Sequence, residues 1–145
     1  MKITFEKIAD GEEDEIIVRS SSKNPELMRV LALLESQDVI LTAYSNGGIF
    51  RIRPEDVFYV EAIDRAVFLH CESEVYEAKY KLHELEKMLA AYDFFRISKS
   101  MLVNLLQIKS FTFVAKGRLE AVMKSGEKVP ISRHYMAALK NLLDL

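Results

Sequence analysis

The sequence predicts a mainly β fold of the α+β class, in which antiparallel hairpins are interspersed with helices. Asn46-Gly47 separates two apolar, β-rich segments, and both residues tolerate the positive φ angles of a tight hairpin turn. Turn residues at Lys116-Gly117 and Ser125-Gly126 join three further short segments of the same kind. Strands and helices do not alternate regularly, so a doubly wound parallel sheet is not expected.

The first part of the chain is predicted to hold two strands around the acidic loop 10–15, followed by a helix. The helix begins at Pro25 with Asn24 as its N-cap, because an asparagine oxygen can accept a hydrogen bond from the first turn. Its apolar positions have the spacing i, i+3, i+4, i+7: Leu27, Val30, Leu31 and Leu34. Such a stripe predicts core packing, with self-association as the alternative.

Period-2 patterns and turn residues predict the remaining elements. Strands are expected at 3–8, 16–20, 39–44, 49–53, 57–62, 67–71, 75–79, 108–114, 118–124 and 128–132. A helix over 79–92 has the stripe Leu82, Leu85, Leu89 and Tyr92, and a terminal helix over 133–143 has Tyr135, Leu139 and Leu142. Ser132 is the expected N-cap of the terminal helix.

The stretch 94–105 combines an apolar strand pattern with a cation between two hydroxyls. Apolar residues lead in through Phe94 and lead out through Val103, on either side of Ser98-Lys99-Ser100. We therefore interpret the polar triplet as an exposed crest between two core strands. Arg96 and Asn104 are interpreted as structural, through a strand ion pair and a side-chain amide bonded to nearby backbone.

Composition limits the class of protein. The 145 residues suffice for one domain, or for one domain with a small appendage, and no apolar run is long enough for a membrane span. The acidic start of the chain is unlike a signal peptide, and the lone Cys71 excludes an internal disulfide. These features predict a cytoplasmic protein. Cys71 itself is expected to be a small, at least half-buried hydrophobe.

Catalytic and metal-binding patterns are missing from the sequence. His70, His83 and His134 lack the spacing of a zinc site, and no nucleotide-binding glycine loop or nucleophile elbow occurs. His70 and Cys71 are adjacent strand residues whose side chains point to opposite faces, so they cannot form a nucleophile–base pair. The sequence predicts a protein that is not an enzyme and that uses no cofactor or metal.

The charge distribution favours a polyanionic partner. The net charge is −2, yet residues 1–93 carry 11 Lys and Arg against 19 Asp and Glu, whereas residues 94–145 carry 9 against 3. Four polar islands hold the donors that commonly contact phosphate: Asp64-Arg65, Ser98-Lys99-Ser100, Lys116-Gly117-Arg118 and Ser132-Arg133-His134. A basic segment that merely neutralises an acidic one is the structural alternative.

A linked set of motifs resembles the LytTR family of bacterial DNA-binding domains, over roughly residues 40–143. The motifs are Phe95-Arg96-Ile97-Ser98-Lys99-Ser100, Val103-Asn104, Ile108, Gly117-Arg118, Gly126-Glu127-Lys128 and Ile131-Ser132-Arg133. Ser98 departs from the pattern, since many members have histidine there. Residues 1–38 are too few for the receiver domain that often precedes this domain. The resemblance therefore implies a stand-alone form, with a small αβ extension at 1–38 and the DNA-binding domain at 39–145.

The resemblance also implies an elongated fold of small stacked antiparallel sheets with peripheral helices. Such a domain is a transcriptional regulator that reads double-stranded DNA through loops in the grooves. The family binds imperfect direct repeats, which implies two copies on one operator and leaves open whether they form a homodimer. The implied base contacts are Arg133 and Lys99. The implied backbone contacts are Arg65, Ser98, Ser100, Ser132, His134, Lys116 and Arg118.

Two other functions fit the same residues. One is a non-enzymatic protein-interaction or ligand-sensing module whose basic face meets an acidic partner. The other is RNA binding, which is less favoured because exposed aromatic residues that stack on bases are not evident. Salt dependence separates the first alternative from DNA binding, because affinity for a duplex must fall steeply with salt concentration.

Overall fold

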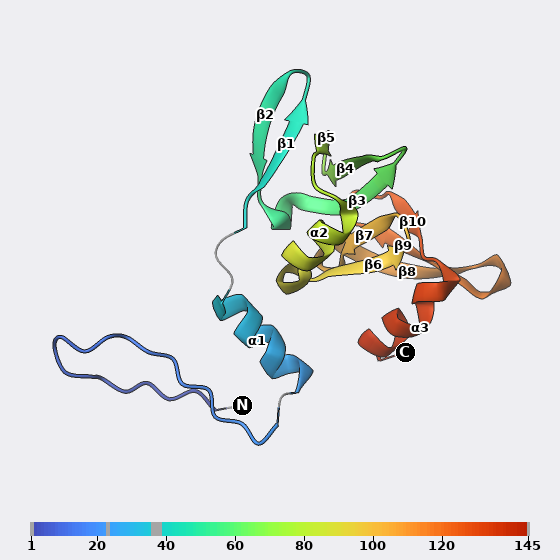
Figure 1. Ribbon diagram of the computed structural model, residues 1–145. Coiled ribbons are helices and arrows are strands. Elements are labelled where there is room, and N and C mark those ends of the chain that lie inside the picture. Colours follow the sequence, from blue (N-terminus) through green and yellow to red (C-terminus); the bar gives the residue numbers. More distant parts are fainter. Residues whose placement is uncertain (1, 23, 36–38, 145) are drawn as a thin grey trace.

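The chain folds into two antiparallel β-sheets with three helices, as seen in a computed structural model that describes residues 2–22, 24–35 and 39–144 (Figure 1). The helices are α1 (Pro25–Glu35), α2 (Leu82–Met88) and α3 (Arg133–Leu142). The strands are β1 (Leu41–Ser45), β2 (Gly48–Ile52), β3 (Val57–Ile63), β4 (Ala66–Cys71), β5 (Val75–Ala78), β6 (Phe94–Ser98), β7 (Met101–Asn104), β8 (Ile108–Val114), β9 (Arg118–Met123) and β10 (Lys128–Pro130). The mainly antiparallel fold predicted from the sequence is confirmed.

The larger sheet has seven strands in the order β2-β1-β5-β4-β3-β7-β6. Its core contains Leu41, Val60, Leu69 and Leu102, and Leu85 of α2 closes it from one side. Short 3-10 turns link these elements at Pro54–Asp56 and at Ala90–Tyr92. The predicted stripe of the second helix is thus confirmed, although the α-helix itself ends at Met88 and Tyr92 belongs to the turn that follows it.

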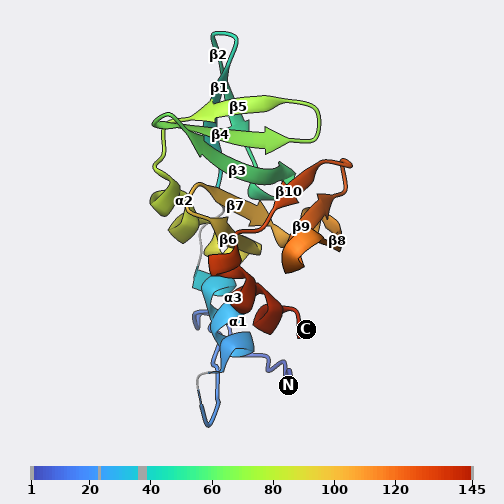
Figure 2. The same cartoon turned by 90° about the vertical axis from the view of Figure 1, so that its right-hand side faces the viewer.

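The smaller sheet has the order β10-β9-β8 and packs with α3 against the opposite side of β6 and β7. Ile97 and Val103 belong to this second core, together with Leu119, Met136 and Leu139. Leu102, the neighbour of Val103 on β7, belongs to the first core, because adjacent strand residues point to opposite faces. The hairpin β6–β7 therefore joins the two cores and gives the molecule its stacked, elongated form (Figure 2).

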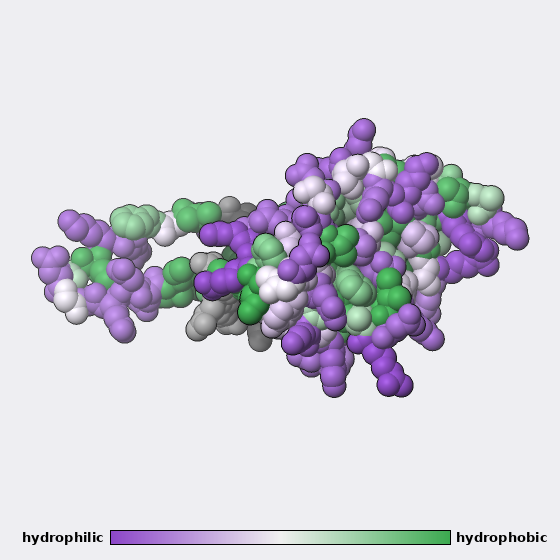
Figure 3. Space-filling view, turned by 90° about the horizontal axis from the view of Figure 1, so that it is seen from above, coloured by the Kyte–Doolittle hydropathy of each residue, from purple (hydrophilic) through white to green (hydrophobic). Residues whose placement is uncertain are grey.

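The N-terminal segment differs from expectation. Residues 2–22 contain no strand and run as an extended, exposed loop that projects away from both sheets (Figures 1 and 3). Ile3 and Phe5 are 93% and 91% exposed, so apolar side chains there have nothing to pack against. The sequence pattern is typical of a strand, but a strand needs a neighbour to satisfy its backbone, and residues 2–22 pair with no strand of either sheet.

The apolar stripe of α1 also lies outside the core. Asn24 caps the helix as predicted, since its Oδ1 accepts a hydrogen bond from the Leu27 N–H at 2.8 Å. Val30 and Leu31 are only half-buried and Leu34 is 50% exposed, so the prediction of core packing was wrong. Arg29 pairs with Asp93, close to the 3-10 turn Ala90–Tyr92, which α1 contacts.

The buried face of α3 differs from the predicted one, because Met136 rather than its neighbour Tyr135 is buried. Leu139 is fully buried as expected, but Met136 packs beside it, whereas Leu142 is 55% exposed. Within the described residues, no helix is long and apolar enough to cross a membrane.

Asn104 holds two segments of backbone together at the centre of the fold. It is 1% exposed, its Nδ2 donates to the Val57 carbonyl at 3.0 Å, and its Oδ1 accepts from the Leu106 N–H at 3.1 Å. The structural role predicted for Asn104 is therefore confirmed.

We expect Asn104→Ala to lower the free energy of unfolding by about 1–3 kcal/mol, because it leaves a buried carbonyl and an N–H without partners. Denaturant unfolding followed by circular dichroism measures this loss. Gln107→Ala is the control, because the hydrogen bond from Gln107 Nε2 to the Glu55 carbonyl is exposed. Equal losses in the two variants would contradict a special role for Asn104.

Candidate nucleic-acid interface

Three of the four polar islands are brought to one edge of the domain by backbone hydrogen bonds. The Ala62 N–H donates to the Ser100 carbonyl at 2.8 Å, which places the β3–β4 turn beside the β6–β7 turn. The Ser132 N–H donates to the Ile97 carbonyl at 2.9 Å, which places the start of α3 on the other side of that turn. We call the group Arg65, Lys99, Arg133 and His134 the basic edge.

The β6–β7 turn presents Lys99 outward. Lys99 is exposed, whereas Ile97 next to it is fully buried. The Ser100 N–H donates to Ser98 Oγ at 3.2 Å, and the two serine hydroxyls lie 3.4 Å apart. The structure thus confirms the exposed crest and shows that both hydroxyls also shape the turn.

The β3–β4 turn presents Arg65 in an unusual backbone conformation. Asp64 and Arg65 have φ angles of 49° and 68°. The β1–β2 hairpin turn, Asn46-Gly47, has nearly the same angles, 48° and 78°, with residues that adopt them at little cost. The β3–β4 turn instead places an arginine where glycine would be less strained. Such strain is concentrated at functional positions, which supports a binding role for this side chain.

The start of α3 presents Arg133 and His134. Both are exposed, and the His134 ring lies edge-on to Tyr135 with ring centres 5.0 Å apart. Ser132 occupies the predicted N-cap position in extended conformation, but its hydroxyl makes no cap hydrogen bond. Ser132 is half-buried and directly precedes the exposed Arg133.

The fourth island lies on the β8–β9 hairpin of the smaller sheet. Lys116 and Gly117 have φ angles of 66° and 70° in its turn, and Arg118 begins β9. The Ile131 N–H donates to the Leu119 carbonyl at 3.1 Å, so Arg118 lies near the start of α3. The tip of this hairpin lies at the far right of Figure 1.

The exposed cations of these islands are not neutralised by the protein. Within the described residues, no ion pair involves the island cations Arg65, Lys99, Lys116, Arg118 and Arg133. The ion pairs that arginines do form there lie outside the islands: Arg29–Asp93, Arg53–Glu55 and Arg96–Glu86. Unpaired cations on one side of a domain attract a polyanion over a distance.

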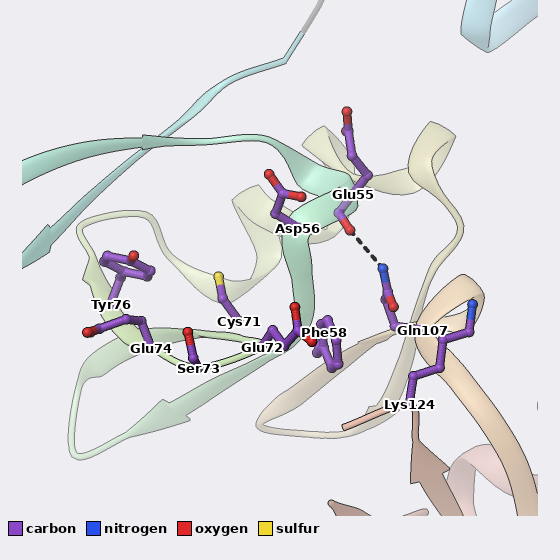
Figure 4. A pocket seen from close by; sticks show the side chains of 10 residues that line it. All are labelled: Glu55, Asp56, Phe58, Cys71, Glu72, Ser73, Glu74, Tyr76, Gln107 and Lys124. Atoms are coloured by element: carbon purple, nitrogen blue, oxygen red, sulfur yellow. Dashed lines mark hydrogen bonds between the residues drawn. The ribbon is translucent and has the colours of Figure 1, made fainter. Parts of the chain in front are cut away.

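The opposite end of β3 and β4 is acidic. A hollow of about 400 Å³ lies there, and Figure 4 shows Glu55, Asp56, Glu72 and Glu74 around it with Lys124 as the nearby cation. Burial and the Asp56 carboxylate raise the pKa of the Cys71 thiol to about 11. Cys71 is half-buried, as predicted, and the raised pKa keeps its thiol protonated. Within the described part of the chain, no cluster of metal-binding residues occurs.

Two features of the site had no local signal in the sequence. One is the proximity of the islands, which depends on pairing between residues more than thirty positions apart, such as Ala62 and Ser100 or Ile97 and Ser132. The other is the environment of Arg96, whose guanidinium binds the β6–β7 turn as well as an acidic partner. The sequence predicted only the ion pair.

Comparison with known proteins agrees with this geometry. A "Sensory transduction protein LytT" from Bacillus cereus is 33% identical over 96 residues, which cover 66% of this chain and 39% of that protein. An uncharacterised HTH-type transcriptional regulator of Staphylococcus aureus strain NCTC 8325 is 26% identical over 147 residues, covering 100% and 99% of the two chains. The chain thus spans about 40% of the LytT proteins from Enterococcus faecalis and B. cereus that it matches.

A solved structure supports the same relationship. The LytTr DNA-binding domain of a B. cereus response regulator superimposes with a TM-score of 0.69 at 28% identity, covering 73% of this chain and 97% of that domain. Residues 47–144 match the sequence model of the LytTr DNA-binding domain. Since that match includes the whole basic edge and more than half of the chain, the protein belongs to the LytTr DNA-binding domain family.

Proposed function

We propose that the protein is a transcriptional regulator that binds double-stranded DNA in a sequence-specific manner through the basic edge. The observation that carries this proposal is the convergence of the β3–β4 turn, the β6–β7 turn and the start of α3, each with an exposed and unpaired cation. Family membership supports the same conclusion. A tandem helix pair joined by a short turn is not found in the described residues, so the two turns and the start of α3 carry the readout.

The residues divide into two roles. Arg133 and Lys99 read base edges, because arginine and lysine donors match the acceptors of guanine in the major groove. The positioning contacts go to phosphate, from Arg65, Ser98, Ser100, Ser132, His134, Lys116 and Arg118. Two copies bind imperfect direct repeats on one operator, and each copy presents the same edge.

A salt titration tests the proposal. The chain is titrated with a duplex enriched from a random-sequence pool and with an unselected duplex of equal length. Both affinities are expected to fall linearly on a log–log plot against salt, with the selected duplex bound more tightly throughout. Absence of binding to either duplex at about 50 mM salt, with the protein folded, would favour an acidic protein partner instead.

Arg65→Gly is expected to weaken binding to all duplexes alike and to reduce the salt slope by about 1, because one phosphate contact is lost. Its free energy of unfolding should stay within about 1 kcal/mol of the wild-type value, since glycine relieves the strain at φ 68° while gaining entropy in the unfolded chain. Salt titrations and denaturant unfolding measure the two effects.

The matched control is Gly47→Ala in the β1–β2 hairpin, where φ is 78°. This variant is expected to lose about 1 kcal/mol of stability and to bind DNA normally. A discriminating loss in Arg65→Gly, confined to the selected duplex, would mean that Arg65 reads bases.

A further inference from the structure

Arg96 has more partners than a strand ion pair requires. Its Nε donates to the Ser98 carbonyl at 2.7 Å, and its Nη2 donates to the Lys99 carbonyl. Its Nη1 donates to Glu86 Oε2 at 2.5 Å. The guanidinium thus binds two consecutive carbonyls of the β6–β7 turn on one side and a carboxylate of α2 on the other.

These bonds suit arginine alone among the side chains. The guanidinium is planar and directs its N–H groups outward in a rigid fork, so three acceptors in fixed directions can be satisfied at once. A lysine ammonium would keep the charge but present its donors from a single mobile atom. The side chain of Arg96 is only 22% exposed, and its charge is already balanced by Glu86, so it is poorly placed to contact phosphate.

The partner helix is itself firmly held. Leu82, Leu85 and Leu89 anchor α2 and its end in the first core. The Glu86 carboxylate therefore connects the turn to a rigid element, rather than to another loop. Without Arg96 the turn would keep the hydrogen bond from the Ala62 N–H to the Ser100 carbonyl. The Ser98 and Lys99 carbonyls, however, would lose the donors that Arg96 supplies.

The same short segment also locates α3, through the bond from the Ser132 N–H to the Ile97 carbonyl. The pairing of β6 with β7 is irregular here, with a register shift between Arg96 and Ser98. A bulge redirects a strand end and removes part of its ladder, so other contacts must define the conformation that follows. Arg96 supplies those contacts.

We propose that the Arg96–Glu86 pair is a positioning device that holds the β6–β7 turn in the conformation that reads DNA, and so determines how well the protein distinguishes its operator from other sequences. This inference rests on the proposed function. Neither residue contacts DNA. A preformed turn avoids the entropy cost of ordering a mobile turn when DNA binds. That cost lowers affinity only for the selected duplex, in which Lys99 must meet a specific base.

The test compares Arg96→Lys and Glu86→Gln with the wild-type chain, using the selected and unselected duplexes. Arg96→Lys is expected to lose about tenfold in affinity for the selected duplex, with an unchanged salt slope and unchanged affinity for the unselected one. Glu86→Gln should show a smaller loss of the same kind. In the double variant the loss should not exceed that of Arg96→Lys, because the two residues act as a unit.

Amide exchange provides a readout that does not depend on DNA. The Ser100 and Lys99 N–H groups are expected to exchange faster in Arg96→Lys, while those of β3 keep their protection. Arg53→Lys is the matched control, because its pair with Glu55 is exposed and 3.8 Å long. It should alter neither exchange in the turn nor discrimination between duplexes.

Several outcomes would overturn the proposal. If Arg96→Lys and Glu86→Gln both distinguish the selected from the unselected duplex as well as the wild type does, the turn does not need the Arg96–Glu86 pair. Equal losses on both duplexes with a lower salt slope would make Arg96 a phosphate contact. If Arg96→Lys fails to fold, Glu86→Gln decides, since Glu86 is 47% exposed and its removal spares the core. Failure of the wild-type chain to bind any duplex would instead refute the proposed function.

Discussion

Arg133→Ala is expected to lower affinity for the selected duplex by about 1–3 kcal/mol, while affinity for unselected DNA falls much less. Arg133 is the first residue of α3, is exposed, and has no ion pair within the described structure. A guanidinium there can bond two acceptors of one base, and loss of such a pair affects only sequences that contain that base. Parallel titrations of the two duplexes measure the difference.

Two further variants separate charge from readout at this position. Arg133→Lys keeps the charge and loses the bidentate geometry, so it should retain the salt slope while discrimination declines. Lys140→Ala removes a cation from the last turn of the same helix, away from the basic edge, and should preserve discrimination. If Arg133→Ala weakened both duplexes equally, Arg133 would be a backbone contact.

Leu139→Ala is expected to lower the free energy of unfolding by about 2–5 kcal/mol, because Leu139 is fully buried and its truncation leaves a cavity between α3 and the smaller sheet. The variant should also weaken DNA binding, since α3 can then no longer hold Arg133 in place. Denaturant unfolding and duplex titration below the unfolding transition measure the two effects.

Leu142→Ala is the control on the same helix. Leu142 is 55% exposed, so its truncation should change stability by no more than about 0.5 kcal/mol. Equal losses in both variants would show that the C-terminal turn of α3 packs against the domain. The pair of variants therefore tests which face of the helix is buried, the point on which the sequence pattern was wrong.

The basic edge and the acidic hollow lie at opposite ends of β3 and β4, which bears on how the domain approaches DNA. Arg65 lies at one end of the strand pair, and the acidic hollow around Asp56 and Glu72 lies at the other. A duplex attracts the first end and repels the second, so the field alone favours approach with the basic edge forward. The small net charge of −2 conceals this separation.

The sequence by itself determined the elements of the domain and their turns. Strand β8 matches the predicted range 108–114, and the hairpin at Asn46-Gly47 forms with the expected positive φ angles. Asn104 was assigned correctly to a structural role through backbone hydrogen bonds, and Lys99 to an exposed crest. These features depend on local chemistry: side-chain periodicity, backbone preferences of turn residues, and the cost of burying an unpaired polar group.

Tertiary structure alone decided which segments meet. The apolar stripe of α1 looks like that of α2, yet only α2 is covered by a sheet, because burial depends on a partner surface and not on the stripe itself. The basic edge arises from the backbone hydrogen bonds Ala62–Ser100 and Ile97–Ser132. The Arg96–Glu86 pair likewise depends on a carboxylate that lies on another element, α2. Such contacts between distant segments leave no periodic trace in the sequence, since they depend on strand order and register.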